Sequence, residues 1–167
     1  MSTESLPAEK LYGADAATDS ACSQRVVVVA ATYNEKYTAA LLQNCLDELG
    51  RLAPQVQVDV VRVPGAFEVP VMVNRAIALP PSDKKAPDAV IALGVILRGS
   101  TAHADLIGEA ITRELLDTAC RSLTPVIHEV LLLNDEQQAE ERCIGERLNR
   151  GIESARAAVA MLNLLHQ

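Results

Sequence analysis

The fold class is decided by the stretch Ala89-Val-Ile-Ala-Leu-Gly-Val-Ile-Leu97, nine residues without a charge. A continuous apolar run of this length is typical of a parallel strand that is buried on both faces. The run Arg25-Val-Val-Val-Val-Ala-Ala31 has the same character, since its four consecutive valines leave no alternation between apolar and polar positions. We therefore expect a parallel sheet that is covered by helices on both faces.

Segments with a helical pattern of apolar residues separate these apolar runs from one another along the chain. Because strands that alternate with helices imply right-handed crossovers, the expected fold is α/β, a three-layer α/β/α domain with a parallel four-stranded sheet. The domain spans 25–167, and residues 1–24 are expected to form an N-terminal arm, loosely ordered or packed on a neighbour. Strands are predicted at 25–31, 56–63, 89–97 and 125–133, and helices near 39–49, 67–79, 101–121, 135–143 and 149–165.

The composition excludes several classes of function. A formal net charge of −7 argues against nucleic acid as the main partner, because a phosphate backbone requires clustered Lys and Arg. No apolar run reaches the roughly 18 residues of a membrane span, and the N-terminus lacks the apolar centre of a signal peptide. The four cysteines have no metal-finger spacing. We expect a soluble cytoplasmic protein with reduced thiols and no metal or membrane partner.

The loop after the first strand lacks the glycines of a phosphate cradle. A dinucleotide site requires Gly-x-Gly-x-x-Gly at this point, and a flavodoxin-type phosphate loop also requires small residues. The chain instead has Thr32-Tyr33-Asn34. Two interpretations of Tyr33 remain open: its ring caps the core, or it offers a flat face for a ligand at the edge of the sheet.

The loop Arg98-Gly-Ser-Thr-Ala-His103 is better suited to an anion. Gly99 allows an unusual backbone angle, Ser100 and Thr101 supply hydroxyls and capping chemistry, and the helix behind them directs free N–H groups toward a ligand. His103 lies in the first turn of that helix, where a neutral imidazole is suited to proton transfer. The alternative is an ordinary capped helix with a surface histidine.

The fourth strand carries two polar residues in its middle, where a buried parallel strand should be apolar. His128 and Glu129 are adjacent and therefore point to opposite faces of the sheet. Such exceptions gather at functional sites or interfaces, although a satisfied buried pair is an equally open interpretation. The charged run 140–150 that follows is either part of a site or a solvated helix face.

Two motifs and their spacing point to a family. Val63-Pro-Gly-Ala-Phe-Glu-Val-Pro70 and Gly94-Val-Ile-Leu-Arg-Gly-Ser-Thr-Ala-His103 closely resemble the 6,7-dimethyl-8-ribityllumazine synthases of riboflavin biosynthesis, and the resemblance covers roughly residues 25–165. It implies a flavodoxin-like fold and a transferase without cofactor or metal. The implied reaction joins 5-amino-6-(D-ribitylamino)uracil to 3,4-dihydroxy-2-butanone 4-phosphate and releases phosphate and water.

The resemblance also implies roles for individual residues. His103 matches the histidine that transfers protons. The pyrimidine and the ribityl chain are assigned to a set of side chains and strand-end backbone: Tyr33, Asn34, Ala66, Phe67, Glu68, Val95, Ile96, Leu97 and, from a neighbouring subunit, His128. The phosphate is assigned to Ser100 and Thr101, to Arg142 of a neighbouring subunit, and to Arg150, which stands where many relatives have lysine.

The C-terminal third departs from the family pattern. His128-Glu129 replaces the usual Phe-Gly, and Glu129 receives no role from the resemblance; the Gly- and Lys-rich segment after Arg142 is also replaced. Because a complete site needs two chains, we expect a homo-oligomer, a pentamer or a multiple of pentamers, which in some relatives closes into an icosahedral shell. Riboflavin synthase is a further candidate partner. The alternative function is a shell-forming or lumazine- or flavin-binding protein with weakened catalysis.

Overall fold

Four parallel strands form a single sheet in a computed structural model that describes residues 24–165. The strand order is β2-β1-β3-β4, so β1 and β3 are central and β2 and β4 are the edges. The strands are β1 (Arg25–Ala31), β2 (Gln57–Val63), β3 (Ala89–Leu97) and β4 (Val126–Leu133). The predicted bounds of β1 and β3 are confirmed to the residue, and those of β2 and β4 to within one residue.

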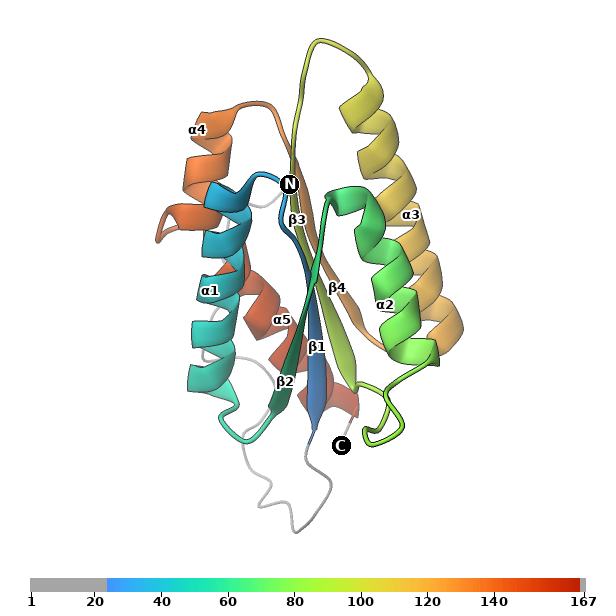
Figure 1. Ribbon diagram of the computed structural model, residues 1–167. Helices are drawn as coiled ribbons and strands as arrows, with labels where there is room; N and C mark the ends of the chain where they lie inside the picture. The colour runs from blue at the N-terminus through green and yellow to red at the C-terminus, as the bar shows by residue number, and fades with distance from the viewer. Residues whose placement is uncertain (1–23, 166–167) are drawn as a thin grey trace.

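Helices cover both faces of the sheet and complete the predicted three-layer α/β/α fold (Figure 1). On one face α1 (Glu35–Leu52) packs against α5 (Arg150–Leu165), and on the other α2 (Val69–Ala78) packs against α3 (His103–Ser122). Short elements connect them: η1 (Ala66–Glu68) precedes α2, and α4 (Glu136–Ala139) leads into a turn of π-helix, η2 (Glu140–Ile144).

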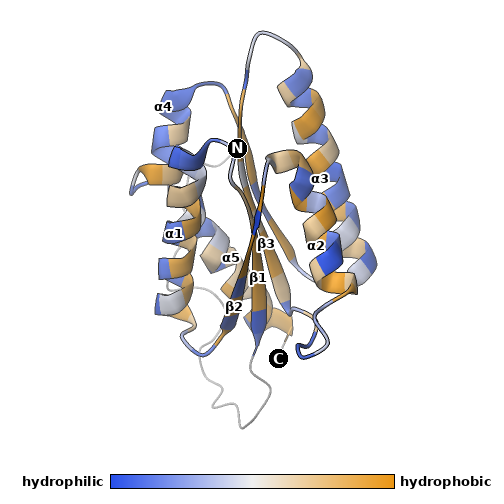
Figure 2. Cartoon of the chain, in the orientation of Figure 1, coloured by the Kyte–Doolittle hydropathy of each residue, from blue (hydrophilic) through white to orange (hydrophobic). Residues whose placement is uncertain are grey.

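Two apolar clusters, one on each face, explain why the strands do not alternate. Val26 and Val28 pack toward α1 and α5, whereas Val27 and Val29 pack toward α2 and α3, and all four are fully buried. Every position of β1 therefore needs an apolar side chain, as expected for a central parallel strand. Figure 2 shows the apolar strands enclosed between helices of mixed hydropathy, with both hydrophilic and hydrophobic turns on α2 and α3.

Two predicted helix boundaries are wrong. The first helix does not end at Gly50 but continues to Leu52, and the N–H of Ala53 closes the last turn on the carbonyl of Leu49. No glycine of the described chain has a positive φ, so Gly50 does not act as a left-handed cap. The helix predicted near 135–143 is also interrupted, because the α-helical part ends at Ala139 and the π-turn η2 follows.

The predicted N-terminal arm lies outside the described residues except for Gln24. The carbonyl of Gln24 accepts a hydrogen bond from the N–H of Gln57 (2.8 Å), which continues the β1–β2 ladder by one residue. Within residues 24–165 no helix is both long enough and apolar enough to span a membrane.

Candidate active site

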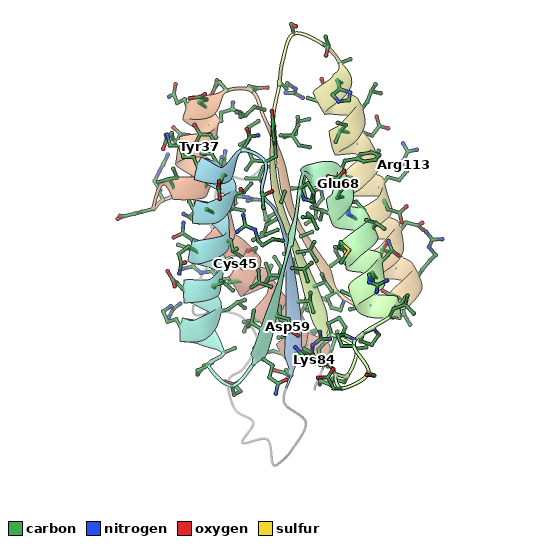
Figure 3. All side chains as sticks on the ribbon, in the orientation of Figure 1. Tyr37, Cys45, Asp59, Glu68, Lys84 and Arg113 are labelled. Carbon is green, nitrogen blue, oxygen red and sulfur yellow. The ribbon has the colours of Figure 1, made fainter. Side chains whose placement is uncertain are left out.

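The two ends of the sheet differ in chemistry. At the amino ends of the strands, Asp59 is ion-paired with Arg25 (2.8 Å) and with Lys84, so these charges neutralise one another. At the carboxyl ends, polar and aromatic side chains follow β1, β2 and β3 in turn. Figure 3 shows Glu68 at this end, opposite Asp59 and Lys84. Ligands of open parallel sheets bind beyond the carboxyl ends of the strands, so this end of the sheet is the candidate site.

The loop after β1 is fixed to its neighbours by backbone hydrogen bonds. The N–H of Tyr33 donates to the carbonyl of Pro64 (2.9 Å), and the side-chain amide of Asn34 donates to the carbonyl of Val95 (2.9 Å). Asn34 has φ 60° and ψ 47°, a left-handed conformation that Asn tolerates better than most residues. The Tyr33 side chain is 73% exposed, which excludes the interpretation that its ring caps the core.

The segment after β2 presents a second exposed ring. Phe67 lies in η1 and is 66% exposed, an unusual state for a residue that normally contributes to a core. Glu68 accepts a hydrogen bond from the N–H of Gly65 (2.9 Å) through Oε2, and this bond closes the turn. A side chain at Gly94 would lie 3.2 Å from Cγ1 of Val130, so the glycine in β3 leaves room for that side chain of β4, whereas Ala66 of η1 would be in ordinary contact at 3.5 Å.

The end of β3 supplies backbone to the same edge. Val95 is buried, and its carbonyl holds Asn34. Ile96 and Leu97 are half-buried and point to opposite faces, Ile96 toward the α2–α3 cluster and Leu97 toward the α1–α5 cluster. Their peptide groups pair with β4 as far as Leu97–Leu133.

The loop after β3 is held by Arg98. Its guanidinium bonds to Asp105 in the first turn of α3 (3.0 Å from Nε and 2.6 Å from Nη2) and to the side chain of Asn134. Arg98 therefore braces the loop within its own chain. The partners Asp105 and Asn134 were missed, and only the acidic residue in the first helical turn gave any signal in the sequence.

Two details of this loop differ from the prediction. Gly99 does not have a positive φ, so residues other than glycine could adopt its backbone conformation. The N-cap of α3 is Ala102, and no side chain caps the helix. Ser100 and Thr101 therefore lie before the cap, exposed, with their hydroxyls outside the capping role predicted for them. His103 is the first residue of α3 and is also exposed.

His128 lies on the α2–α3 face of β4, and both of its ring nitrogens have partners. Nδ1 accepts from the N–H of Val130 (3.1 Å), so the proton of the neutral ring is on Nε2, which lies 2.8 Å from Oγ1 of Thr112 in α3. The N–H of Val130 points to the free edge of the sheet, because the odd-numbered residues of β4 bond to β3. Burial lowers the pKa of His128 and favours this neutral form.

Glu129 points to the opposite face, as predicted, and lies beneath α5. It is 6% exposed, and its Oε2 accepts a hydrogen bond from Nε of Arg150 (3.0 Å) at the start of that helix. Burial raises the pKa of Glu129 to about 7, although the positive charges of Arg150 and Arg142 oppose the rise. Arg142 itself lies in the π-turn η2, and π-turns of this kind are frequent at functional sites.

Within one chain the predicted residues form two groups. The residues after β1 and β2 and at the end of β3 are joined by hydrogen bonds at one edge, and the Arg98–His103 loop continues from β3 at the same edge. Arg142 and Arg150 lie with η2 and α5 on the face opposite α3 (Figure 1). Arg150, predicted to face a phosphate, is engaged by Glu129 of its own chain.

Comparison with known proteins assigns the chain to a family. The family model described as 6,7-dimethyl-8-ribityllumazine synthase matches residues 23–166. Relatives with that name include proteins of Thermococcus kodakarensis, 38% identical over 84% of this chain and 86% of its own length, and of Nitrobacter hamburgensis, 36% identical over 84% and 85%. A third, from Thermococcus gammatolerans, is 35% identical over 86% and 88%. The chain therefore belongs to the 6,7-dimethyl-8-ribityllumazine synthase family, transferases of riboflavin biosynthesis.

Proposed function

We propose that the chain condenses 5-amino-6-(D-ribitylamino)uracil with 3,4-dihydroxy-2-butanone 4-phosphate to give 6,7-dimethyl-8-ribityllumazine, phosphate and water. The observation that carries this proposal is the pair of exposed rings, Tyr33 and Phe67, beside Glu68 at the carboxyl edge. Large apolar groups held in solvent by a rigid backbone are typical of a binding surface for a flat ligand.

The pyrimidine substrate is assigned to the ends of β1, β2 and β3. Tyr33 stacks on its ring, and Asn34, which is already anchored to Val95, keeps the loop in place for that contact. The backbone of Val95, Ile96 and Leu97 lines the ring. Ala66 and Phe67 hold the ribityl chain, and Glu68 accepts hydrogen bonds from its hydroxyls with the carboxylate oxygen that does not bind Gly65.

The phosphate substrate is assigned to the loop before α3 and to cations of a neighbouring subunit. Ser100 and Thr101 donate hydroxyl hydrogen bonds, and the N–H groups at the start of α3, whose N-cap has no side-chain partner, add a positive dipole end. Arg142 supplies a full positive charge from the neighbour, with Arg150 behind it. His128 of the neighbour contacts the pyrimidine through its ring, since both of its nitrogens are engaged within its own chain.

The reaction begins when the amine attacks the ketone and an imine forms with loss of water. Phosphate is then eliminated, and the second nitrogen attacks the carbonyl that results and closes the ring as a second water leaves. His103, exposed at the first turn of α3, transfers the protons, while Arg142 and the helix N-terminus stabilise the leaving phosphate. The site holds two reactants in a fixed geometry, so much of the acceleration arises from proximity. No cofactor or metal takes part in this scheme.

The shared site requires a homo-oligomer, a pentamer or a multiple of pentamers. Exposed apolar side chains on α2 and α3 and directly after each helix support such contacts, because exposed apolar surface often marks a protein–protein interface. They are Val71, Leu79, Leu106, Leu116 and Leu123. The cytoplasm is the proposed compartment, and riboflavin synthase, which acts on the product, is the proposed protein partner.

The direct test mixes the purified protein with the two substrates and follows the absorbance of the lumazine. We expect a rate well above that of the spontaneous condensation. A rate equal to the spontaneous one would contradict the proposal and favour the second candidate, a lumazine- or flavin-binding or shell-forming protein. That candidate is favoured by one observation: His128 and Glu129 are both committed to contacts within the chain.

A further inference from the structure

Glu129 is a buried acid that the proposed reaction does not use. It lies in the middle of β4, on the same face as Ile127 and Leu131, which pack against the α1–α5 core. A carboxylate in such a place is costly unless it is paired. The pairing is made by Arg150, whose side chain is only partly buried, so the ion pair runs from the core toward the surface.

The groups around Glu129 come from three elements. Arg150 and Glu153 belong to α5, Arg142 and Cys143 to η2, and Cys45 to α1. The two arginines act favourably on the carboxylate and Glu153 acts against it, while burial of Glu129 favours its neutral form. Glu129 is thus paired directly with Arg150, while Arg142 acts on it only electrostatically.

The backbone that carries the two arginines is also tied together. Asn149, buried before α5, caps that helix by accepting from the N–H groups of Gly151 (3.0 Å) and Ile152 (3.2 Å). Its amide donates to the carbonyls of Gly145 (2.9 Å) and Cys143 (3.3 Å), at the end of η2. The start of α5 and the π-turn with Arg142 therefore form one fixed unit.

The guanidinium of Arg150 is held at one atom. Its Nε donates to Glu129, and within residues 24–165 its Nη atoms make no hydrogen bond. A guanidinium fixed through Nε keeps two nitrogens in a set plane, and such a preorganised fork is suited to a phosphate.

We propose that Glu129 is a positioning residue for the phosphate subsite: its carboxylate fixes the direction in which the Nη atoms of Arg150 donate. This inference rests on the proposed function, which assigns Arg150 to the phosphate. In its ionised form Glu129 orients Arg150 and at the same time offsets part of its charge.

The test measures binding of inorganic phosphate by calorimetry to the assembled protein and its variants. Glu129→Ala removes the acceptor, and the Kd should rise about tenfold, the usual effect of losing one oriented charged hydrogen bond. Glu129→Gln keeps an oxygen that accepts from Nε and removes the offsetting charge, so its Kd should equal that of the unchanged protein or fall. An unchanged Kd in Glu129→Ala, or an equal rise in both variants, would overturn the proposal.

A double-mutant cycle separates positioning from a loss of packing. Glu129→Ala should change the Kd in the presence of Arg150 and have no further effect in an Arg150→Ala background. An equal change in both backgrounds would overturn the proposal. Glu48→Ala is the matched control, because Glu48 of α1 is also buried and is ion-paired with Arg51 of the same helix and with Arg156 of α5. It should lower thermal stability and leave the phosphate Kd unchanged.

Activity distinguishes this inference from the proposed function. If the unchanged protein condenses the two substrates while Glu129→Ala leaves the phosphate Kd and the KM of the phosphate substrate unchanged, only the positioning role fails. If the unchanged protein binds phosphate in a Glu129-dependent way without condensing the substrates, only the proposed reaction fails. In the active enzyme Glu129→Ala should raise the KM of the phosphate substrate and leave that of the pyrimidine unchanged.

Discussion

The carboxyl ends of β1, β2 and β3 and the segment from β4 to the start of α5 are built on different principles. At the strand ends, main-chain hydrogen bonds fix the loops, and the rings of Tyr33 and Phe67 stay exposed. From β4 onward the polar side chains are committed: His128 to α3 and Glu129 to Arg150. In the first region two aromatic side chains are exposed and can contact a ligand, while in the second region His128 and Glu129 form contacts within their own chain.

This difference indicates separate roles for the two regions in the proposed reaction. In the proposed function the strand ends hold both reactants and the proton-transferring histidine, whereas the arginines of the β4–α5 segment supply positive charge to the phosphate of a neighbouring site. Substitution of Tyr33 or His103 should therefore change pyrimidine binding or turnover, and substitution of the arginines should change phosphate binding. Each prediction below tests that division.

The largest effect is expected at His103. His103→Ala should lower kcat about 100-fold, at the lower end of what general acid–base catalysis contributes, because the bound reactants remain in position. Steady-state kinetics should show KM values that change little. Arg113→Ala is the control, since Arg113 is exposed farther along α3 and paired only with Glu109. If the two variants had equal kcat, proton transfer would not belong to the strand-end region.

The next effect is expected at Arg142. Arg142→Ala should raise the KM of the phosphate substrate about 30-fold through loss of a charged hydrogen bond worth about 2 kcal/mol, with a smaller change in kcat. Arg147→Ala, an exposed arginine just after η2, should leave this KM unchanged. An unchanged KM in Arg142→Ala would remove the β4–α5 segment from the phosphate subsite.

A stability measurement tests the β4–α5 segment through a different quantity. The folded pKa of Glu129, about 7, is above the ordinary carboxyl value of 4.5, so the folded chain keeps a proton that the unfolded chain has lost. Its contribution is therefore present below the unfolded pKa and is lost as the pH rises through 7, by about 2–3 kcal/mol. Urea unfolding from pH 5 to pH 8 should show this decline in the unchanged protein and not in Glu129→Gln.

Glu48 of α1 is a second buried acid, and its pKa is shifted in the opposite direction. Its two arginine partners hold its pKa at about 2, led by the hydrogen bond from Arg51. Its stabilisation is therefore present above the unfolded pKa and is lost as the pH falls toward 2. In Glu48→Gln the decline between pH 5 and 8 should persist; if it vanished there as well, the assignment to Glu129 would be wrong.

The smallest effect is expected at Tyr33. Tyr33→Ala should raise the KM of the pyrimidine substrate about tenfold, since an aromatic stack contributes roughly 0.5–1.5 kcal/mol beyond the area it buries. Tyr33→Phe retains the ring and should stay within about twofold of the unchanged protein. A large effect of Tyr33→Phe would show that the hydroxyl, rather than the exposed face, contacts the substrate.

The sequence predicted the bounds of the strands and of α5 well, but not the contacts between β4, η2 and α5, for a physical reason. A strand buried on both faces must be apolar at every position, so β1 and β3 were visible to the residue. The partner of Glu129 is 21 positions away, and no local pattern shows which side chain at the start of α5 lies over it, although the start itself was predicted to within one residue. The π-turn η2 was likewise invisible, because its residues fit an ordinary helical pattern.

The candidate site followed the same rule. The exposed state of Tyr33 remained open in the sequence because a ring after a buried strand fits both interpretations, and only the packed loop excludes one of them. The capping role predicted for Ser100 and Thr101 was wrong because α3 begins later, at His103. Hydroxyls that precede a helix suggest a cap, but the turn of the loop decides which residue occupies it.

The central claim is that each site combines the strand ends of one chain with the β4–α5 segment of the next. Its most direct test is co-expression of His103→Ala with Arg142→Ala in one mixed oligomer. Each variant alone is defective when the phosphate substrate is held well below the raised KM of Arg142→Ala, and random mixing should restore about a quarter of the normal sites, since each interface draws its two halves independently from the two chains. Recovery of about that fraction of the unchanged rate is the predicted result. A rate equal to the mean of the two separate variants would contradict the shared site.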